Sequence, residues 1–225
     1  MGGHEGETSQ GGCTVSGAAE VSPMIEQVAR IRIELRELEP GIWRRVDVPL
    51  SSTLEALHHI IQVAFRWQDY HLYEFVVGER AYGVPSDEDA FYDRKVYKAS
   101  AIRLKTVVER GVDRFLYVYD FGDDWRHDVI VEEVRDGAGD AEYPAFVDGA
   151  RRCPPEDVGG PPGFMEFLEA VLDPVHEEHA RMREWYGGPF DPEDIDEMWI
   201  RSVLKMYAAR RRGPLASHRG GSRRG

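Results

Sequence analysis

The sequence predicts an α+β fold with a mainly antiparallel sheet, helices packed on it, and a helix-rich C-terminal third. Segments with the strand period of two fill most of the first two thirds of the chain, and segments with helical spacing fill the last third. Strands and helices do not alternate regularly, as they would around a parallel sheet. The chain has 225 residues, of which 42% are hydrophobic and 11% aromatic, enough for a sizeable core.

Composition divides the chain into three parts. Residues 1–24 are rich in Gly, Ser and Glu and have no period, so we expect a disordered leader. Residues 25–209 are expected to form a single α+β domain, and residues 210–225 a disordered basic tail. The net charge of −13 argues against a body that wraps nucleic acid. Arg210, Arg211 and Arg212 of the tail are candidates for nucleic-acid contact, although a solvated terminus is the simpler interpretation.

The sequence predicts neither a membrane span nor a disulfide framework. The N-terminus lacks a basic start and an apolar h-region, and no apolar run approaches the roughly 18 residues that span a bilayer. The two cysteines, Cys13 and Cys153, have no C-x-x-C partner, so a thiolate zinc site is not expected. We therefore expect a cytoplasmic protein without a membrane partner. The residues do not indicate an oligomeric state.

The domain is expected to begin with an antiparallel hairpin. Ile31, Ile33 and Leu35 alternate with charged residues, which is the pattern of a half-buried strand. Pro40 and Gly41 supply a turn, and residues 42–48 alternate again as the returning strand.

A helix is expected after this hairpin. Ser52 and Glu55 form a capping box, and apolar residues recur at helical spacing from Leu54 onward. His58 and His59 point about 100° apart on such a helix. We therefore expect both histidines at the surface or boundary, and not on one metal ion.

More strands are expected in the middle of the chain. Residues 71–77 are rich in aromatic and β-branched side chains, and residues 78–83 turn the strand back. Residues 101–111 predict a short helix, and residues 114–120 and 125–134 predict two further strands.

The segment "FGDD" lies where a hairpin turn joins these last two strands. Gly and Asp tolerate the backbone angles of tight turns, and we expect Gly122 to adopt an unusual angle. The letters D-F-G do not indicate a kinase, because the Gly-rich loop, the lysine strand and the H-R-D loop are missing from the sequence.

The last third is expected to contain a shaped Pro/Gly loop and helices. The loop "GARRCPPEDVGGPPG" precedes a helix at residues 164–173, and a second helix follows Pro174. Asp191 and Pro192 predict the start of a final helix. Its expected buried stripe consists of Ile195, Met198, Val203 and Met206.

Three polar clusters are candidates for a functional site. They are His71 with Tyr73 on one strand, Asp120, Asp123, Asp124, Trp125 and His127 at the hairpin, and Glu156 with Asp157 in the Pro/Gly loop. Carboxylates and histidines together suit a divalent metal ion, with His71, His127 and Asp120 as its expected ligands. In the alternative interpretation, Asp120 and Asp123 only bond turn amides, and Trp125 and His127 fill the rim of the core.

Four segments carry a family resemblance. "HLYEF", "YVYDFGDDWRH", "CPPEDVGGPPGFMEFL" and "FDPEDID" resemble the plasmid pRiA4b ORF-3-like family, whose members are also described as TnpR-like passenger proteins of insertion elements. The resemblance runs from about residue 31 to residue 204. It implies an α+β fold in which the hairpin and the Pro/Gly loop share one domain, and it implies no particular reaction.

Two functions remain open at this point. The first is an accessory or regulatory binding protein of plasmids and insertion elements, with a protein or nucleic-acid partner. The second is a metal-dependent enzyme, such as a hydrolase, with its site at the hairpin and the Pro/Gly loop. A serine recombinase is not expected, because Ser16 and Ser22 lie in the leader and the body lacks a basic recognition helix.

Overall fold

The computed structural model describes residues 1–2, 26–86, 94–139 and 141–212. Within these residues the strands form one sheet of eight, in the order β5-β4-β3-β6-β7-β1-β2-β8. Neighbouring strands pair antiparallel, except β4 with β5. The strands are β1 Gln27–Leu35, β2 Trp43–Pro49, β3 Tyr73–Val77, β4 Arg80–Gly83, β5 Val96–Lys98, β6 Arg114–Tyr119, β7 Trp125–Asp136 and β8 Ala145–Ala150. The prediction of an α+β fold with a mainly antiparallel sheet is confirmed.

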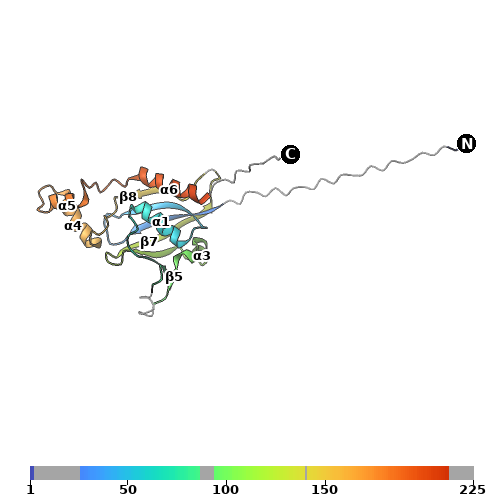
Figure 1. Ribbon diagram of the computed structural model, residues 1–225, viewed down its shortest axis with the longest axis horizontal. Helices are drawn as coiled ribbons and strands as arrows, with labels where there is room; N and C mark the ends of the chain where they lie inside the picture. The colour runs from blue at the N-terminus through green and yellow to red at the C-terminus, as the bar shows by residue number, and fades with distance from the viewer. Residues whose placement is uncertain (3–25, 87–93, 140, 213–225) are drawn as a thin grey trace, which may run out of the picture.

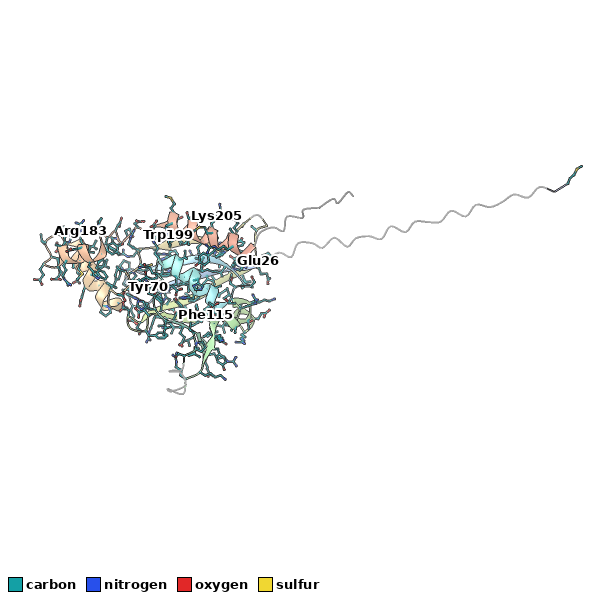
Figure 2. All side chains as sticks on the ribbon, viewed as in Figure 1. Glu26, Tyr70, Phe115, Arg183, Trp199 and Lys205 are labelled. Carbon is teal, nitrogen blue, oxygen red and sulfur yellow. The ribbon has the colours of Figure 1, made fainter. Side chains whose placement is uncertain are left out.

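The helices lie across the sheet and at one end of it (Figure 1). They are α1 Leu54–Phe65, the short 3-10 helix η1 Ala99–Ala101, α3 Leu104–Glu109, α4 Gly160–Leu172, α5 His179–Tyr186 and α6 Glu197–Arg212. Helix α1 crosses the sheet, α6 runs beside β8, and α4 and α5 lie together at the left end, away from α3 (Figure 1). Figure 2 places Arg183 of α5 and Glu26, which precedes β1, at opposite ends of the molecule.

The core forms where inward-facing side chains of five strands meet α1. Successive side chains of a strand point to opposite faces, so every second residue faces the helix. The inward positions are Ile31, Ile33 and Leu35 of β1, Arg44, Val46 and Val48 of β2, Tyr73, Phe75 and Val77 of β3, Phe115, Tyr117 and Tyr119 of β6, and Trp125, His127 and Val129 of β7, all buried. The other face is charged, as in the pair of Arg45 with Glu132 at 2.6 and 2.8 Å.

The N-terminus of α1 differs from the expected capping box. Thr53 is the cap, and its Oγ1 accepts a hydrogen bond from the backbone N–H of Ala56 at 3.1 Å. Ser52 is buried instead, and its Oγ has no hydrogen-bond partner. The expected cap, Ser52, is therefore one residue too early. Ser and Thr are both good N-caps, and the two residues are adjacent in the sequence.

We expect Thr53→Ala to lower the free energy of unfolding by about 1 kcal/mol, because an N–H of the first helical turn loses its acceptor. Urea titration of the variant checks this value. Ser52→Ala is the matched control and should be neutral or slightly stabilising, since it removes a buried hydroxyl that has no partner. A larger loss of stability in Ser52→Ala than in Thr53→Ala would show that Ser52 is the cap.

The two neighbouring histidines of α1 lie in different environments. His58 is fully buried, so its expected surface position is wrong, whereas His59 is partly exposed. Helical spacing explains the difference: His58 shares the buried stripe of Leu54, Ile61 and Phe65, at steps of four, three and four residues.

Helix α6 begins later than Asp191 and buries a different stripe. The carboxylates of Asp191 and Asp194 accept backbone hydrogen bonds two residues onward, from Glu193 at 2.9 Å and Asp196 at 2.8 Å. These Asx turns occupy the segment that was expected to start the helix. The buried side chains of the helix are Ile200, Leu204 and Ala208, while the expected Met198 and Met206 are exposed.

Candidate metal centre

The pairing of β3 with β6 brings His71 and Asp120 to the same end of the sheet. Tyr73, at the start of β3, pairs with Tyr119, at the end of β6. The ladder extends one step further, where the N–H of Asp120 donates to the carbonyl of Leu72 at 2.9 Å. His71 lies just before β3, so the expected strand position of this residue is not observed. Its neighbour Tyr70 is labelled in Figure 2.

The turn after β6 is organised by Asp120. One carboxylate oxygen, Oδ1, accepts from the N–H of Gly122 at 2.9 Å and of Asp123 at 3.3 Å. Asp120 and Asp124 have positive φ angles of 55° and 54°, whereas Gly122 does not, so the expectation for Gly122 is wrong. Asp tolerates this conformation because its short side chain bonds the local backbone. The second oxygen of Asp120, Oδ2, faces His71.

The Pro/Gly loop supplies two more carboxylates. Oε1 of Glu156 accepts from the N–H of Gln68 at 2.8 Å and from the hydroxyl of Tyr119 at 3.0 Å. These bonds fix the carboxylate, and its other oxygen faces His71. Asp157 follows with a positive φ of 59° and also presents an oxygen to the imidazole.

Three carboxylates therefore approach the imidazole of His71, and we call the four residues the His71 group: His71, Asp120, Glu156 and Asp157. From Nε2 of His71 the distances are 3.2 Å to Oδ1 of Asp157, 3.5 Å to Oδ2 of Asp120 and 3.9 Å to Oε2 of Glu156. Ligand atoms about 2.1 Å from a shared ion stand about 3.0 Å apart at octahedral angles and about 3.4 Å apart at tetrahedral ones. The distances to Asp157 and Asp120 are close to this spacing, whereas Oε2 of Glu156 stands further away.

Two atoms of the group have no hydrogen-bond partner although they are buried. They are Nε2 of His71 and Oε2 of Glu156. The side chain of Glu156 is only 9% exposed, and its free oxygen points toward the histidine. A buried polar atom without a partner costs free energy, and a cation between the two atoms would offset that cost. Asp157 is 70% exposed, so the group opens to solvent on this side.

The electrostatics of the group also favour a cation. Burial raises the pKa of the Glu156 carboxyl above its ordinary value. Burial raises the pKa of Tyr119 as well, and the adjacent Glu156 raises it further. Both shifts reflect the cost of negative charge at this buried position. His71, Asp120 and Asp157 each offer a ligand atom within 4.8 Å of the others, and the donor set suits Mn²⁺, Zn²⁺ or Fe²⁺.

His127 does not belong to the group, contrary to the expected ligand set. It is fully buried in the middle of the sheet, where its ring lies edge-on to those of Phe65 and Trp67 at 5.0 and 5.2 Å. Its Nδ1 lies 3.4 Å from the carbonyl oxygen of Tyr117. Strand alternation predicted the correct face for this residue, but it does not indicate the depth along the strand.

The remaining candidates hold the fold around the group. Asp123 accepts from the N–H of Gly159 at 3.1 Å and joins the hairpin to the Pro/Gly loop. Asp124 pairs with Arg126 at 2.8 Å. Trp125 is fully buried in the core. Tyr73 stacks on His58 with ring centroids 3.5 Å apart.

A second polar cluster was missed by the sequence reasoning. His58 lies 2.7 Å from Asp69 through Nε2 and 2.7 Å from the hydroxyl of Tyr117 through Nδ1. His59, Asp69 and His58 stand close enough to share an ion, contrary to expectation. Both ring nitrogens of His58 are already engaged, so this cluster is a closed hydrogen-bond network. The sequence signal that could have revealed this cluster is the helical spacing that places His58 on the buried face of α1.

Other expected contacts fall outside a common site. Helix α6 includes Arg210, Arg211 and Arg212, so these three residues do not belong to a separate tail. Arg211 donates to Glu26 at 2.8 Å and to the carbonyl of Tyr143 at 3.2 Å, which ties the helix to the sheet. Residues 3–25 and 213–225, which contain the expected leader and most of the expected tail, lie outside the described residues.

Comparison with known proteins identifies a family for this chain. Residues 27–198 match the family described as plasmid pRiA4b ORF-3-like protein. The chain belongs to this family. Uncharacterized protein y4hQ of Sinorhizobium fredii is 40% identical over 164 residues, which cover 73% of this chain and 83% of the relative.

A solved structure with a similar fold comes from Methanosarcina mazei Go1. The protein, of unknown function and designated MM3350, superimposes with a TM-score of 0.69 and 32% identity. The match covers 77% of this chain and 97% of that one. In the described part of the chain, no helix combines the length and apolarity that a membrane crossing requires.

Proposed function

We propose that this pRiA4b ORF-3-like chain is an accessory or regulatory binding protein of plasmids and insertion elements, and that its His71 group binds a divalent metal ion. The observation that carries the metal proposal is the pair of buried atoms without a hydrogen bond, Nε2 of His71 and Oε2 of Glu156, which stand 3.9 Å apart. The plasmid role is supported by the family's description. The sequence contains no complete catalytic motif, which favours binding over catalysis.

The partner of such a protein is a second macromolecule, a protein or a nucleic acid. The ion would tie together the ends of β3 and β6 and the Pro/Gly loop, which are joined by protein contacts such as that of Asp123 with Gly159. Binding would therefore stiffen this end of the molecule, where the surface of the loop is available to a partner. Of the arginines expected to contact nucleic acid, Arg210 is exposed on α6 and is available to such a partner.

Metal titration of the purified full chain tests the site. We expect one Mn²⁺ or Zn²⁺ per chain, and a stabilisation of about 2.7 kcal/mol when the free ion is at 100 times its Kd. His71→Ala should weaken binding at least tenfold, because it removes the one nitrogen ligand. Asp120→Asn should do the same, yet its amide oxygen can still accept the turn hydrogen bonds.

The matched control is His59→Ala, which removes a partly exposed histidine beside Asp69 and leaves the His71 group intact. Its metal affinity should equal that of the unmodified chain. If neither ion binds or raises the melting temperature, or if His71→Ala binds as well as the control, the metal site is wrong.

A metal-dependent hydrolase is the second candidate function, and one feature favours it. In this function His71, Asp120 and Asp157 would hold the ion, and Glu156, whose pKa is raised by burial, stands beside it as a general base would. Asp157 also borders a cavity of about 420 Å³ between α4 and α5, which is large enough for a small substrate. Glu156→Gln should keep the hydrogen bonds to Oε1. Metal-dependent ester or phosphoester hydrolysis that this variant abolishes would favour the enzyme over the binding protein.

A further inference from the structure

Arg44 of β2 is an almost completely buried cation that contacts Ala150 and Cys153 at the start of the Pro/Gly loop. Its side chain lies under the end of α1 and is only 1% exposed. Nε donates to the carbonyl of Ala64 at 2.8 Å, and Nη1 donates to the carbonyls of Trp43 at 2.8 Å and Ala150 at 2.9 Å. Nη2 contacts Sγ of Cys153 at 3.2 Å. Four of the five N–H groups of a guanidinium are thus engaged.

The charge of Arg44 is not balanced by these contacts. Among the described residues it forms no ion pair with a carboxylate, and its acceptors are neutral carbonyls and a sulfur atom. Burial raises the pKa of Cys153 to about 11, so this sulfur is a neutral thiol at pH 7. The C-terminal end of α1 supplies about half a negative charge. The half charge of the helix end neutralises the buried cation only in part, so an additional anion close to Arg44 would stabilise it.

A cavity opens from this buried guanidinium to solvent. It has a volume of about 160 Å³, and its wall includes Arg44, Cys153, Arg66, Arg152, Tyr186 and Asp194. Water occupies about 30 Å³ per molecule in the liquid, so the space holds about five waters or one small oxyanion. It is too small for a nucleotide, whose pockets start at about 300 Å³.

Two further arginines face the same cavity from its rim. Arg152 donates to the hydroxyl of Tyr186 at 2.9 Å and pairs with Asp194 at 2.5 Å. Arg66, which follows α1, pairs with Asp196, which does not line the cavity. Three guanidinium groups thus line the cavity with one carboxylate, and guanidinium groups match the oxygen spacing of phosphate.

We propose that this cavity binds a small tetrahedral oxyanion, phosphate or sulfate, with Arg44 as its buried anchor and Arg66 and Arg152 at its mouth. The ion enters from the exposed rim and takes the free Nη2 hydrogen of Arg44. The site shares no residue with the His71 group, so it is independent of the metal proposal. A phosphate monoester could enter with the same group, while its organic part stays outside.

Calorimetric titration of the full chain with inorganic phosphate tests the proposal, with chloride kept constant. We expect one phosphate per chain, and Arg152→Gln should weaken binding about tenfold by removing a charged donor. Arg66→Gln should also weaken it, and this residue lies at the surface, where its loss does not threaten folding. Arg151→Gln is the matched control, because Arg151 also forms an ion pair, with Glu193, but does not line the cavity.

Glycerol 3-phosphate in a parallel titration separates the two sources of the ion. Tighter binding of inorganic phosphate indicates a free ion, and tighter binding of the ester indicates a phosphorylated ligand; both support an oxyanion site. Absence of binding by phosphate, sulfate and the ester at millimolar concentration would overturn the proposal. Equal phosphate affinity in Arg152→Gln, Arg66→Gln and Arg151→Gln would overturn it as well.

Discussion

Acidification from pH 6.5 to pH 4.5 is expected to lower the free energy of unfolding by about 5 kcal/mol, because two buried histidines stay uncharged in the folded protein. Burial lowers the pKa of His127 to about 3 and that of His58 to about 4. In the unfolded chain each histidine titrates near 6.5. Between these values the unfolded state binds more protons, so stability falls as the pH falls, by about 1.4 kcal/mol per unit for each residue.

The environments of the two histidines explain why protonation is unfavourable. His127 is enclosed by the rings of Phe65, Trp67 and Tyr117, which offer no counter-charge. His58 donates from Nε2 to the Asp69 carboxylate, so its Nδ1 accepts from the Tyr117 hydroxyl, the tautomer of a neutral imidazole. Asp69 opposes the effect of burial at His58, but burial is the larger influence.

The test is urea unfolding at half-unit steps of pH. His127→Leu should reduce the slope of stability against pH by about one proton, whatever its own effect on stability. Glu156 acts in the opposite direction, since its raised pKa favours the folded state at low pH. A slope that is the same with and without His127 would contradict the prediction.

The strands could be predicted from the sequence because alternation records which face of a sheet is buried. Ile31, Ile33 and Leu35 lie inward as expected. Helical phase was harder to predict. The apolar residues after Asp191 fit more than one stripe, and the two Asx turns before α6 decide which stripe faces the sheet.

All four residues of the His71 group were candidates from the sequence, and the meeting of His71 and Asp120 could be predicted for a topological reason. Polar residues just beyond the paired ends of two strands meet at one edge, which is why His71 and Asp120 come together. The approach of Glu156 depends on a tertiary bond to Gln68, and local patterns do not indicate such a bond. His127 is expected at the site because it is close in sequence to the carboxylates of the hairpin. Its position within the strand instead places it in the core.

Gly160→Ala is expected to destabilise the protein by about 2 to 5 kcal/mol, since the new methyl group meets both backbone strain and a collision. Gly160 has a φ of +68°, where a side chain is strained, and a Cβ at this position would stand 2.5 Å from the carbonyl oxygen of Asp123. The close approach joins the hairpin turn to the Pro/Gly loop. The backbone must move apart, and Glu156 and Asp157 move with the loop.

Gly187→Ala separates the strain from the collision. Its φ is +89°, but a Cβ there meets nothing within 4 Å, so the expected loss is about 1 kcal/mol. The difference between the two variants in urea unfolding measures the contact with Asp123. Because that contact positions half of the His71 group, Gly160→Ala should also weaken Mn²⁺ binding, whereas Gly187→Ala should not. Equal losses of stability in both variants would show that the hairpin and the loop are not held together at Gly160.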